Sequence, residues 1–333
     1  MSLLDKLKKN SKISKSAVLA ESEFFGEREI CPTAIPALNI ALSGDVDGGI
    51  GSGLHMLAGP SKHYKTSIAL YLASAYLKKY KDAVLLFLDC EFGSPKEYFA
   101  TFGIDTKRVF HVPFSNLEEL KFEIMSQLDN ITEEDKVFIL VDSLGSASSL
   151  KEYQDSLDGK SVADMSRAKA IKSITRLVTP HLTMKDIPMV AVSHVYQEIG
   201  MFPKQIMSGG TGLTYSANDI WFIGRSQDKG SDGEIKGWNF TITVEKSRTV
   251  KEKAKIGIHV TYEGGISKFS GMLDLAVEAG LVQKQPAGWY IIKGTDKKLR
   301  EKDLLTDEWL SSVLKNEEFK TFIKNKFKLV SNI

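Results

Sequence analysis

Cysteine is scarce in this chain of 333 residues, where only Cys31 and Cys90 occur. The two lie far apart without metal-ligand spacing around them, which argues against a disulfide framework and a zinc site. Long apolar runs are missing too, because none approaches the roughly 20 residues that span a bilayer. The lysine-rich start lacks the apolar segment of a secretory signal. We therefore expect a cytoplasmic protein that is neither secreted nor inserted into a membrane.

An excess of charge of one sign is also absent. The 44 basic residues are balanced by 42 acidic ones, for a net charge of +2, so overall charge neither demands nor excludes a nucleic-acid partner. Any basic surface must come from local clustering. Internal repeats and low-complexity tracts are lacking as well. The length favours one large domain with appendages, or two domains.

From residue 54 onward, short apolar runs alternate with longer helical patterns. This alternation is typical of a βαβ sheet that is covered on both faces. The expected strands span 54–58, 83–89, 109–113, 137–142 and 189–193, and the expected helices span 65–79, 95–102, 116–130 and 161–178. After residue 218 three strand patterns, 220–224, 238–244 and 256–262, follow without helices between them. The sequence thus predicts an α/β fold whose mostly parallel sheet ends in an antiparallel section.

Two appendages flank this core, which we place at residues 31–270. Residues 1–30 carry apolar side chains such as Leu3, Leu4 and Leu7 on a background too polar for a core of their own. Such a segment docks on its own domain or on the next subunit, and the sequence leaves both open. Residues 271–333 begin with a short helix over 271–281 and end in two charged helical stretches around Trp309 and Phe322.

A P-loop-like segment follows the first expected strand. Its residues are Gly59, Pro60, Ser61, Lys62, His63, Tyr64, Lys65 and Thr66. In such a loop backbone N–H groups surround the phosphates, Lys65 neutralises the β and γ oxygens, and Thr66 ligates Mg²⁺. Tyr64 stands where the motif has its second Gly, so we expect a helical φ at residue 64 and a ring that points away from the nucleotide. An ordinary strand-loop-helix with a chance Lys-Thr pair stays open at this point.

Carboxylates follow two neighbouring expected strands. Asp142 ends the buried run 137–142, where a Walker B carboxylate holds the hydration shell of Mg²⁺. Glu91 follows the run that ends at Asp89, on the edge where open α/β sheets bind ligands, and a carboxylate there can deprotonate water. Either residue alone is more often a turn residue. The P-loop, Glu91 and Asp142 together, each at the end of an expected strand, predict a site for ATP and Mg²⁺.

These motifs together resemble the RecA superfamily and, more closely, the UvsX recombinases of T-even-like phages. The likeness runs from about residue 17 to about residue 290. It rests on the P-loop and on Leu88-Asp89-Cys90-Glu91-Phe92-Gly93, Val141-Asp142-Ser143-Leu144-Gly145, Val192-Ser193-His194-Val195-Tyr196 and Val244-Glu245-Lys246-Ser247-Arg248-Thr249-Val250-Lys251. That subgroup tolerates an aromatic residue at the second P-loop Gly, so Tyr64 supports the resemblance.

The resemblance implies a RecA-like P-loop core that hydrolyses ATP with Mg²⁺, forms filaments on single-stranded DNA and performs strand exchange. Lys65 and Thr66 would then bind phosphate and Mg²⁺, Asp142 would be the Walker B acid, and Glu91 would be the catalytic base. Tyr98 aligns with the residue that stacks on adenine.

The resemblance also implies a γ-phosphate sensor and a contact between subunits. His194 stands where RecA proteins carry a Gln that senses the γ-phosphate, although a lone histidine at a strand end is more often structural. Lys246 and Arg248 lie two apart on an expected strand, so both should project from one face. In the family this pair reaches the neighbour's γ-phosphate. A solvated strand face is the plain alternative.

Two segments have the composition of DNA contacts. Residues 198–212 form a Gly-rich stretch that resembles the second DNA-binding loop of RecA proteins, with N–H groups for phosphates and apolar side chains for bases. A first loop over 146–162 leads into a helix with a basic stripe, although such a stripe is at least as often a solvated surface. The expected DNA contacts are Met201, Phe202, Lys204, Gly209, Gly210, Thr211, Arg167, Lys169, Lys172 and Arg176.

Two alternatives to a filament-forming recombinase remain at this point. A ring-forming RecA-fold helicase or circadian-type ATPase would use the same site, and Tyr64 also raises a catalytically impaired subunit. The resemblance further implies double-stranded DNA, single-strand-binding proteins and recombination mediators as partners, in the bacterial cytoplasm of a phage host. It departs at residues 293–333, which carry ten Lys and Arg against seven Asp and Glu where the family has an acidic end.

Overall fold

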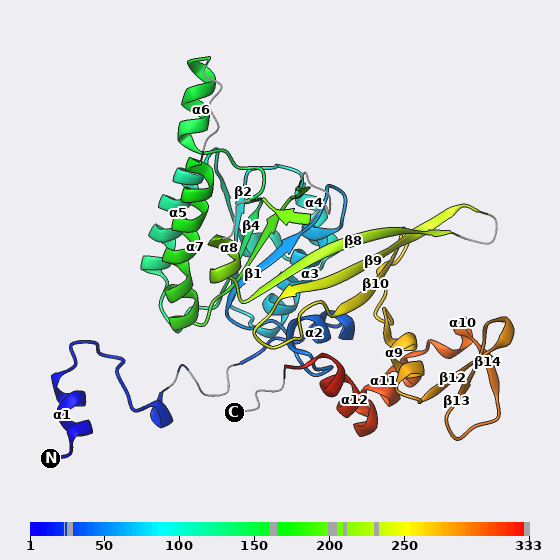
Figure 1. Ribbon diagram of the computed structural model, residues 1–333. Helices are drawn as coiled ribbons and strands as arrows, with labels where there is room; N and C mark the ends of the chain where they lie inside the picture. The colour runs from blue at the N-terminus through cyan, green and yellow to red at the C-terminus, as the bar shows by residue number, and fades with distance from the viewer. Residues whose placement is uncertain are drawn as a thin grey trace.

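The computed structural model describes residues 1–22, 24, 29–159, 165–198, 205–208, 212–229 and 233–329. Within these residues, the core is a nine-stranded sheet with the order β11-β10-β9-β8-β1-β5-β4-β2-β3 (Figure 1). Its strands span Gly53–Ala58 (β1), Val84–Asp89 (β2), Val109–Pro113 (β3), Val137–Asp142 (β4), Pro188–Ser193 (β5), Asp219–Lys229 (β8), Ile235–Lys246 (β9), Lys255–Thr261 (β10) and Gly265–Ile266 (β11). A separate ribbon pairs Val195–Gln197 (β6) with Gln205–Met207 (β7).

The sheet has a parallel and an antiparallel half. Strands β3, β2, β4, β5, β1 and β8 pair in parallel, whereas β8 to β11 pair in antiparallel fashion. The expected α/β fold is therefore confirmed, and β1 to β5 begin and end within one residue of the expected positions. β8 and β9 are longer than expected because their polar ends continue to pair after the apolar run stops, and the hairpin projects from the core (Figure 1).

Helices cover both faces of the sheet (Figure 1). They span Leu3–Asn10 (α1), Pro36–Ser43 (α2), Lys65–Lys79 (α3), Lys96–Thr101 (α4), Leu117–Asn130 (α5), Leu150–Leu157 (α6), Ser166–Met184 (α7), Gly212–Ser216 (α8), Met272–Glu278 (α9), Glu301–Leu304 (α10), Asp307–Lys315 (α11) and Glu317–Phe327 (α12). Short 3₁₀ turns span Leu19–Glu21, Thr106–Arg108 and Pro286–Gly288. Helices α2, α6, α8 and α10 were not expected. α7 continues past residue 178 with Pro180 inside it, and its expected start at 161 lies outside the described residues.

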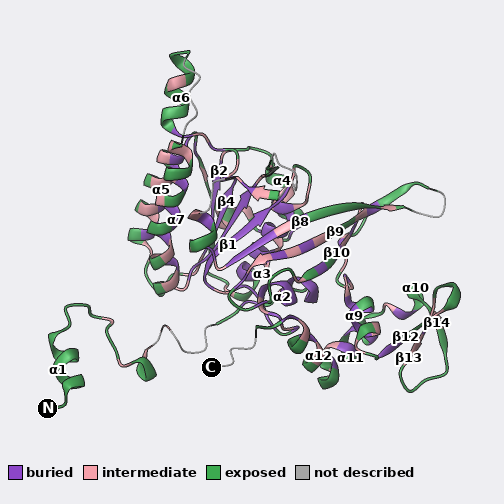
Figure 2. Ribbon diagram, in the orientation of Figure 1, coloured by how far each residue is buried: buried purple, intermediate pink, exposed green. Residues whose placement is uncertain are grey.

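The two faces of the sheet bury separate apolar clusters, drawn as buried strands between the helices in Figure 2. Alternate residues of β1 enter different clusters, because successive side chains of a strand point to opposite faces. Leu54 and Met56 pack with α5 and α7, whereas Leu57 packs with α2 and α3. The strands that carry the site are therefore held from both sides.

The carboxyl-terminal region differs from its expectation. The helix at 271–281 is present as α9, and the two charged helical stretches are α11 and α12. The region also contains a three-stranded antiparallel sheet that was not expected, formed by Val282–Gln285 (β12), Trp289–Ile292 (β13) and Lys298–Arg300 (β14). These strands, of three or four residues each, are too short to show a clear alternation. Buried side chains of this region join the cluster that contains α2 and α3.

The amino-terminal helix α1 buries none of its residues. Leu3, Leu4 and Leu7 are 73%, 50% and 60% exposed, and α1 lies away from the core at the end of an extended segment (Figure 1). The structure thus gives these leucines no partner surface on their own domain within the described residues. Across the same residues, none of the helices has the length and apolarity to cross a membrane.

Candidate active site

The P-loop connects β1 to α3 and closes around the side chain of its lysine. Lys65 is 6% exposed, and its Nζ donates a hydrogen bond to the Pro60 carbonyl at 2.8 Å. Burial lowers the pKa of Lys65, against the attraction of Glu91 and Asp142. Gly59 is required by close approach, because a Cβ there would lie 2.9 Å from the Ile223 carbonyl oxygen. Contacts within the chain therefore fix the conformation of the loop.

Tyr64 keeps the backbone conformation of the glycine that it replaces. Its φ of 61° is left-handed, so the expected helical φ was wrong. A left-handed residue with a Cβ costs about 1–2 kcal/mol. The ring stacks on Phe240 of β9, with centroids 5.3 Å apart and planes at 27°, and burial raises the pKa of Tyr64 to about 12. The adjacent antiparallel strand thus supplies the contact that offsets the strain.

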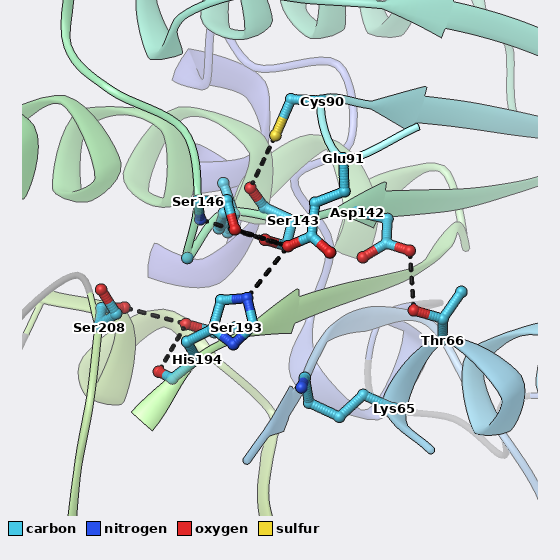
Figure 3. Close-up of polar contacts among 12 residues, drawn as sticks. Lys65, Thr66, Cys90, Glu91, Asp142, Ser143, Ser146, Ser193, His194 and Ser208 are labelled. Carbon is cyan, nitrogen blue, oxygen red and sulfur yellow. Dashed lines mark hydrogen bonds and ion pairs between the residues drawn. The ribbon is translucent and has the colours of Figure 1, made fainter. Parts of the chain in front are cut away.

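Thr66 and Asp142 meet across the ends of α3 and β4 (Figure 3). The Thr66 hydroxyl donates to Asp142 Oδ2 at 2.8 Å. Asp142 is 4% exposed, and its buried Oδ1 has no hydrogen-bond donor among the described residues. Burial raises the pKa of Asp142 to about 6, opposed by the Thr66 hydrogen bond. A hydroxyl and a buried carboxylate with an unpaired oxygen fit a hard divalent cation such as Mg²⁺.

Three donors converge on the carboxylate of Glu91, just beyond β2 (Figure 3). Ser143 Oγ and Ser146 Oγ lie 2.5 Å and 2.6 Å from Glu91 Oε1, and His194 Nε2 lies 3.1 Å from the same oxygen. Burial alone would raise the pKa of Glu91, but these hydrogen bonds hold it below its ordinary value. The sequence analysis missed the two serines as partners of Glu91, although Ser143 lies inside a matched motif.

These groups line one cavity of about 660 Å³. Residues 61–67, Glu91, Tyr98, Asp142 and His194 form its parallel-strand wall. The Tyr98 hydroxyl hydrogen-bonds to Ser67, and its ring meets Phe102 edge-on at 5.0 Å. The expected P-loop, carboxylates, sensor histidine and tyrosine are thus brought together.

The opposite wall was not expected and comes from β8, β9 and the turn after β10. Arg225, Trp238 and Tyr262 line it. Arg225 lies 4.0 Å from the centre of the Trp238 ring and donates to the Lys62 carbonyl at 3.0 Å. Trp238 Nε1 donates to the Tyr262 hydroxyl at 3.1 Å. Aromatic residues in the late strand patterns were the available signal, but their position over the P-loop depends on how the hairpin folds back.

Comparisons with known proteins agree with this geometry. The RecA N-terminal domain matches residues 6–267, and the C-terminal domain of the bacteriophage T4 recombination and repair protein matches residues 269–323. The chain is 43% identical to the recombination and repair protein of Enterobacteria phage T4 over 338 aligned residues. The alignment covers 98% of this chain and 86% of the phage T4 protein. The chain belongs to the RecA family.

Bacterial RecA proteins are similar to this chain at lower sequence identity. The RecA proteins of Arthrobacter sp. (strain FB24) and Streptomyces rimosus are 24% and 26% identical to this chain, over 80% and 84% of it and 74% and 73% of their own length. Members of the family are DNA-dependent ATPases, and this protein is a UvsX-like recombinase of that kind.

In this recombinase Lys246 and Arg248 lie outside the lining of the cavity. β9 ends at Lys246, so the expectation that one strand carries both residues was wrong. Lys246 Nζ donates to the carbonyls of Thr214 and, at 2.7 Å, Ala217, at the end of α8. Burial and the charge of Arg248 lower the pKa of Lys246. Arg248 is exposed in the turn that follows.

The expected DNA contacts of the recombinase fall into three groups. Met201, Phe202, Lys204, Gly209, Gly210 and Thr211 lie outside the described residues. Lys169, Lys172 and Arg176 are exposed on α7, as a phosphate-tracking stripe requires. Arg167 differs, because its guanidinium is hydrogen-bonded within the chain.

Proposed function

We propose that the recombinase hydrolyses ATP at the carboxyl edge of its parallel strands, with the residue roles that follow. The observation that carries this proposal is the convergence of Lys65, Asp142 and Glu91 around one cavity. Residues 59–66 hold the triphosphate, with Lys65 on the β and γ oxygens. Tyr98 stacks on adenine.

Glu91 is the base that accepts a proton from the attacking water. Its lowered pKa keeps the carboxylate ionised at neutral pH. Ser143, Ser146 and His194 fix the direction of the carboxylate, and His194 senses the γ-phosphate. Thr66 and Asp142 would hold Mg²⁺, which would supply positive charge to offset negative charge on the triphosphate.

The proposed active assembly is a helical filament in which ATP lies between protomers. Lys246 and Arg248 of one protomer approach the γ-phosphate that its neighbour binds, as cationic groups supplied in trans. Their position outside the cavity of their own chain supports this arrangement. The exposed leucines of α1 supply an apolar surface for the neighbour. ATP then closes the interface, and hydrolysis loosens it.

DNA binds this filament without sequence preference. Lys169, Lys172 and Arg176 contact phosphates, and the stretch 198–212 supplies the second DNA-binding loop. Affinity accumulates along the lattice. This explains how each protomer can carry a net charge of only +2. The exchange partner is double-stranded DNA, with single-strand-binding and mediator proteins acting on the filament in the host cytoplasm.

Two measurements test this proposal. The first is the rate of phosphate release from ATP with and without single-stranded DNA, and the second is electron microscopy of the same samples. We expect DNA to raise turnover by about tenfold or more and filaments to form with ATP and DNA. Lys65→Ala should abolish turnover, and Lys121→Ala on α5 is its matched control. A wild-type protein that consumes no ATP would contradict the proposal, and closed hexameric rings would contradict its filament.

A further inference from the structure

The guanidinium of Arg167, which is partly buried, is hydrogen-bonded within the chain. Nε donates to the Ala147 carbonyl at 2.9 Å, and Nη1 donates to Ser208 Oγ at 2.9 Å. Nη2 donates to the carbonyls of Leu144 at 3.1 Å and Gly145 at 2.5 Å. Guanidinium has five N–H donors in a rigid fork, so most of them are used within the chain. The hydrogen bonds are charge-assisted and strong.

The acceptors of Arg167 belong to two different segments. Leu144, Gly145 and Ala147 form the turn after β4, and the same turn holds the serines that donate to Glu91. Ser208 directly follows β7, inside the segment that we predict to be the second DNA-binding loop. Its N–H donates to the His194 carbonyl at 2.8 Å. Arg167 therefore connects the turn that orients Glu91 with a segment expected to contact DNA.

The turn after β4 and the segment around Ser208 pack tightly where they meet the end of β5. A Cβ on Gly145 would lie 2.5 Å from the His194 backbone nitrogen, so the turn lies directly against the end of β5. Leu144 N–H donates to the Val192 carbonyl at 3.0 Å, and Ser193 Oγ donates to the Ser208 carbonyl at 3.1 Å. In close-packed protein a shift of one member is passed to its neighbours. A displacement of Ser208 must therefore move the turn or the backbone of His194.

We infer that Arg167 is a positioning residue that couples DNA binding to the orientation of Glu91. This inference rests on the proposed function. DNA that shifts Ser208 changes where Arg167 holds the turn, and thereby where the hydroxyls of Ser143 and Ser146 hold the Glu91 carboxylate. A lysine cannot replace the fork, because one ammonium cannot reach acceptors in both segments with the same geometry.

The coupling is tested by measuring the ATP hydrolysis rate of the Arg167→Lys and Arg167→Ala variants at increasing concentrations of single-stranded DNA. We expect the plateau rate at saturating DNA to fall about tenfold, while the DNA concentration for half-maximal stimulation stays within about twofold of wild type. If Arg167 instead contacted a DNA phosphate directly, its substitution should raise the DNA concentration for half-maximal stimulation and leave the plateau rate unchanged.

Arg108 provides a matched control. It also donates four hydrogen bonds to backbone carbonyls, those of Leu77, Tyr80 and Ala83, but at the opposite edge of the sheet. Arg108→Lys should lower thermal stability as Arg167→Lys does, without a change in the stimulated-to-basal ratio. Ser208→Ala removes one acceptor and should lower the plateau about threefold. The double variant with Arg167→Ala should be no worse than Arg167→Ala alone.

The possible results separate this inference from the proposed function. Arg167→Lys with a wild-type plateau overturns the coupling, and so does a plateau loss of equal size in Arg108→Lys. If Arg167→Ala does not fold, the Lys and Ser208 variants still decide the question. A wild-type enzyme that DNA does not stimulate overturns the proposed function instead.

Discussion

The parallel and antiparallel halves of the sheet contribute different groups to the site. In the parallel half, the ends of β1, β2, β4 and β5 place the P-loop, Glu91, Asp142 and His194 along one edge. The antiparallel half gives the opposite wall of the cavity and, at the end of β9, Lys246. Parallel strands all direct their carboxyl ends to one edge, where reactive side chains converge. Antiparallel strands alternate in direction, so they do not bring their carboxyl ends to one edge, and here they supply a wall of the cavity.

Loss of the proposed base, Glu91 in the parallel half, should have the largest effect on hydrolysis. We expect Glu91→Gln to lower the hydrolysis rate about 10³-fold, because an amide cannot accept the proton of water. Nucleotide binding should persist, since Lys65 and Thr66 are unchanged. Single-turnover hydrolysis and binding of a fluorescent ATP analogue measure the two quantities. Glu97→Gln, in the exposed part of α4, is the control, and a Glu91→Gln enzyme with near-normal hydrolysis would contradict the assignment.

Loss of Lys246 in the antiparallel half should have the next largest effect. We expect Lys246→Ala to lower DNA-stimulated hydrolysis about 10²-fold, less than loss of a sole cationic finger because Arg248 remains. Folding should be preserved, because Lys246 is only partly buried. Lys253→Ala is the control, since that lysine makes an exposed ion pair with Glu245 near the same turn.

A mixture of the two variants tests whether the halves act in different protomers. Glu91→Gln protomers still offer Lys246, and Lys246→Ala protomers still offer Glu91. An equimolar mixture should therefore regain activity at about a quarter of its interfaces. A mixture as inactive as its components would place both groups in the same protomer and remove the trans arrangement.

The same division explains how far the sequence could predict the structure. The parallel strands β1 to β5 were predicted within one residue, because strands buried on both faces are continuous apolar runs. Lys65, Asp142 and Glu91 could be predicted as site residues because each lies at or after the end of such a run. The opposite wall with Trp238 and the inward direction of Arg167 could not, because both depend on contacts between segments distant in sequence. The strands β12 to β14 were missed because runs of three or four residues are too short to show a period.

A smaller effect should come from the buried carboxylate of the parallel half. The pKa of Asp142 is raised to about 6, so the folded protein binds this proton more tightly than the unfolded chain. The ionised form therefore destabilises the metal-free protein fully above about pH 6, and the penalty disappears as the pH falls toward about 4. Asp142→Asn should raise stability by roughly 2 kcal/mol near pH 8 and not at all near pH 4.

Denaturant unfolding with a chelator, from about pH 4 to about pH 8, measures this difference. The Asn side chain can still accept the Thr66 hydrogen bond, so the change removes charge and keeps the contact. Asp82→Asn, at an exposed position, should change stability by no more than about 0.5 kcal/mol at either pH. An Asp142→Asn protein whose gain does not depend on pH would contradict the assigned titration.

The smallest effect, on the free energy of unfolding, should come from Tyr64, whose ring stacks on Phe240 of the antiparallel half. Tyr64→Gly loses the stacked pair, worth about 0.5–1.5 kcal/mol beyond burial, but relieves the strain of the left-handed φ. Tyr64→Ala loses the pair and keeps the strain. We therefore expect the Gly variant to be more stable than the Ala variant by roughly 1 kcal/mol, the reverse of their order inside a helix. Chemical denaturation of the two proteins decides the sign, and an Ala variant that is the more stable would mean that residue 64 is not held at a positive φ.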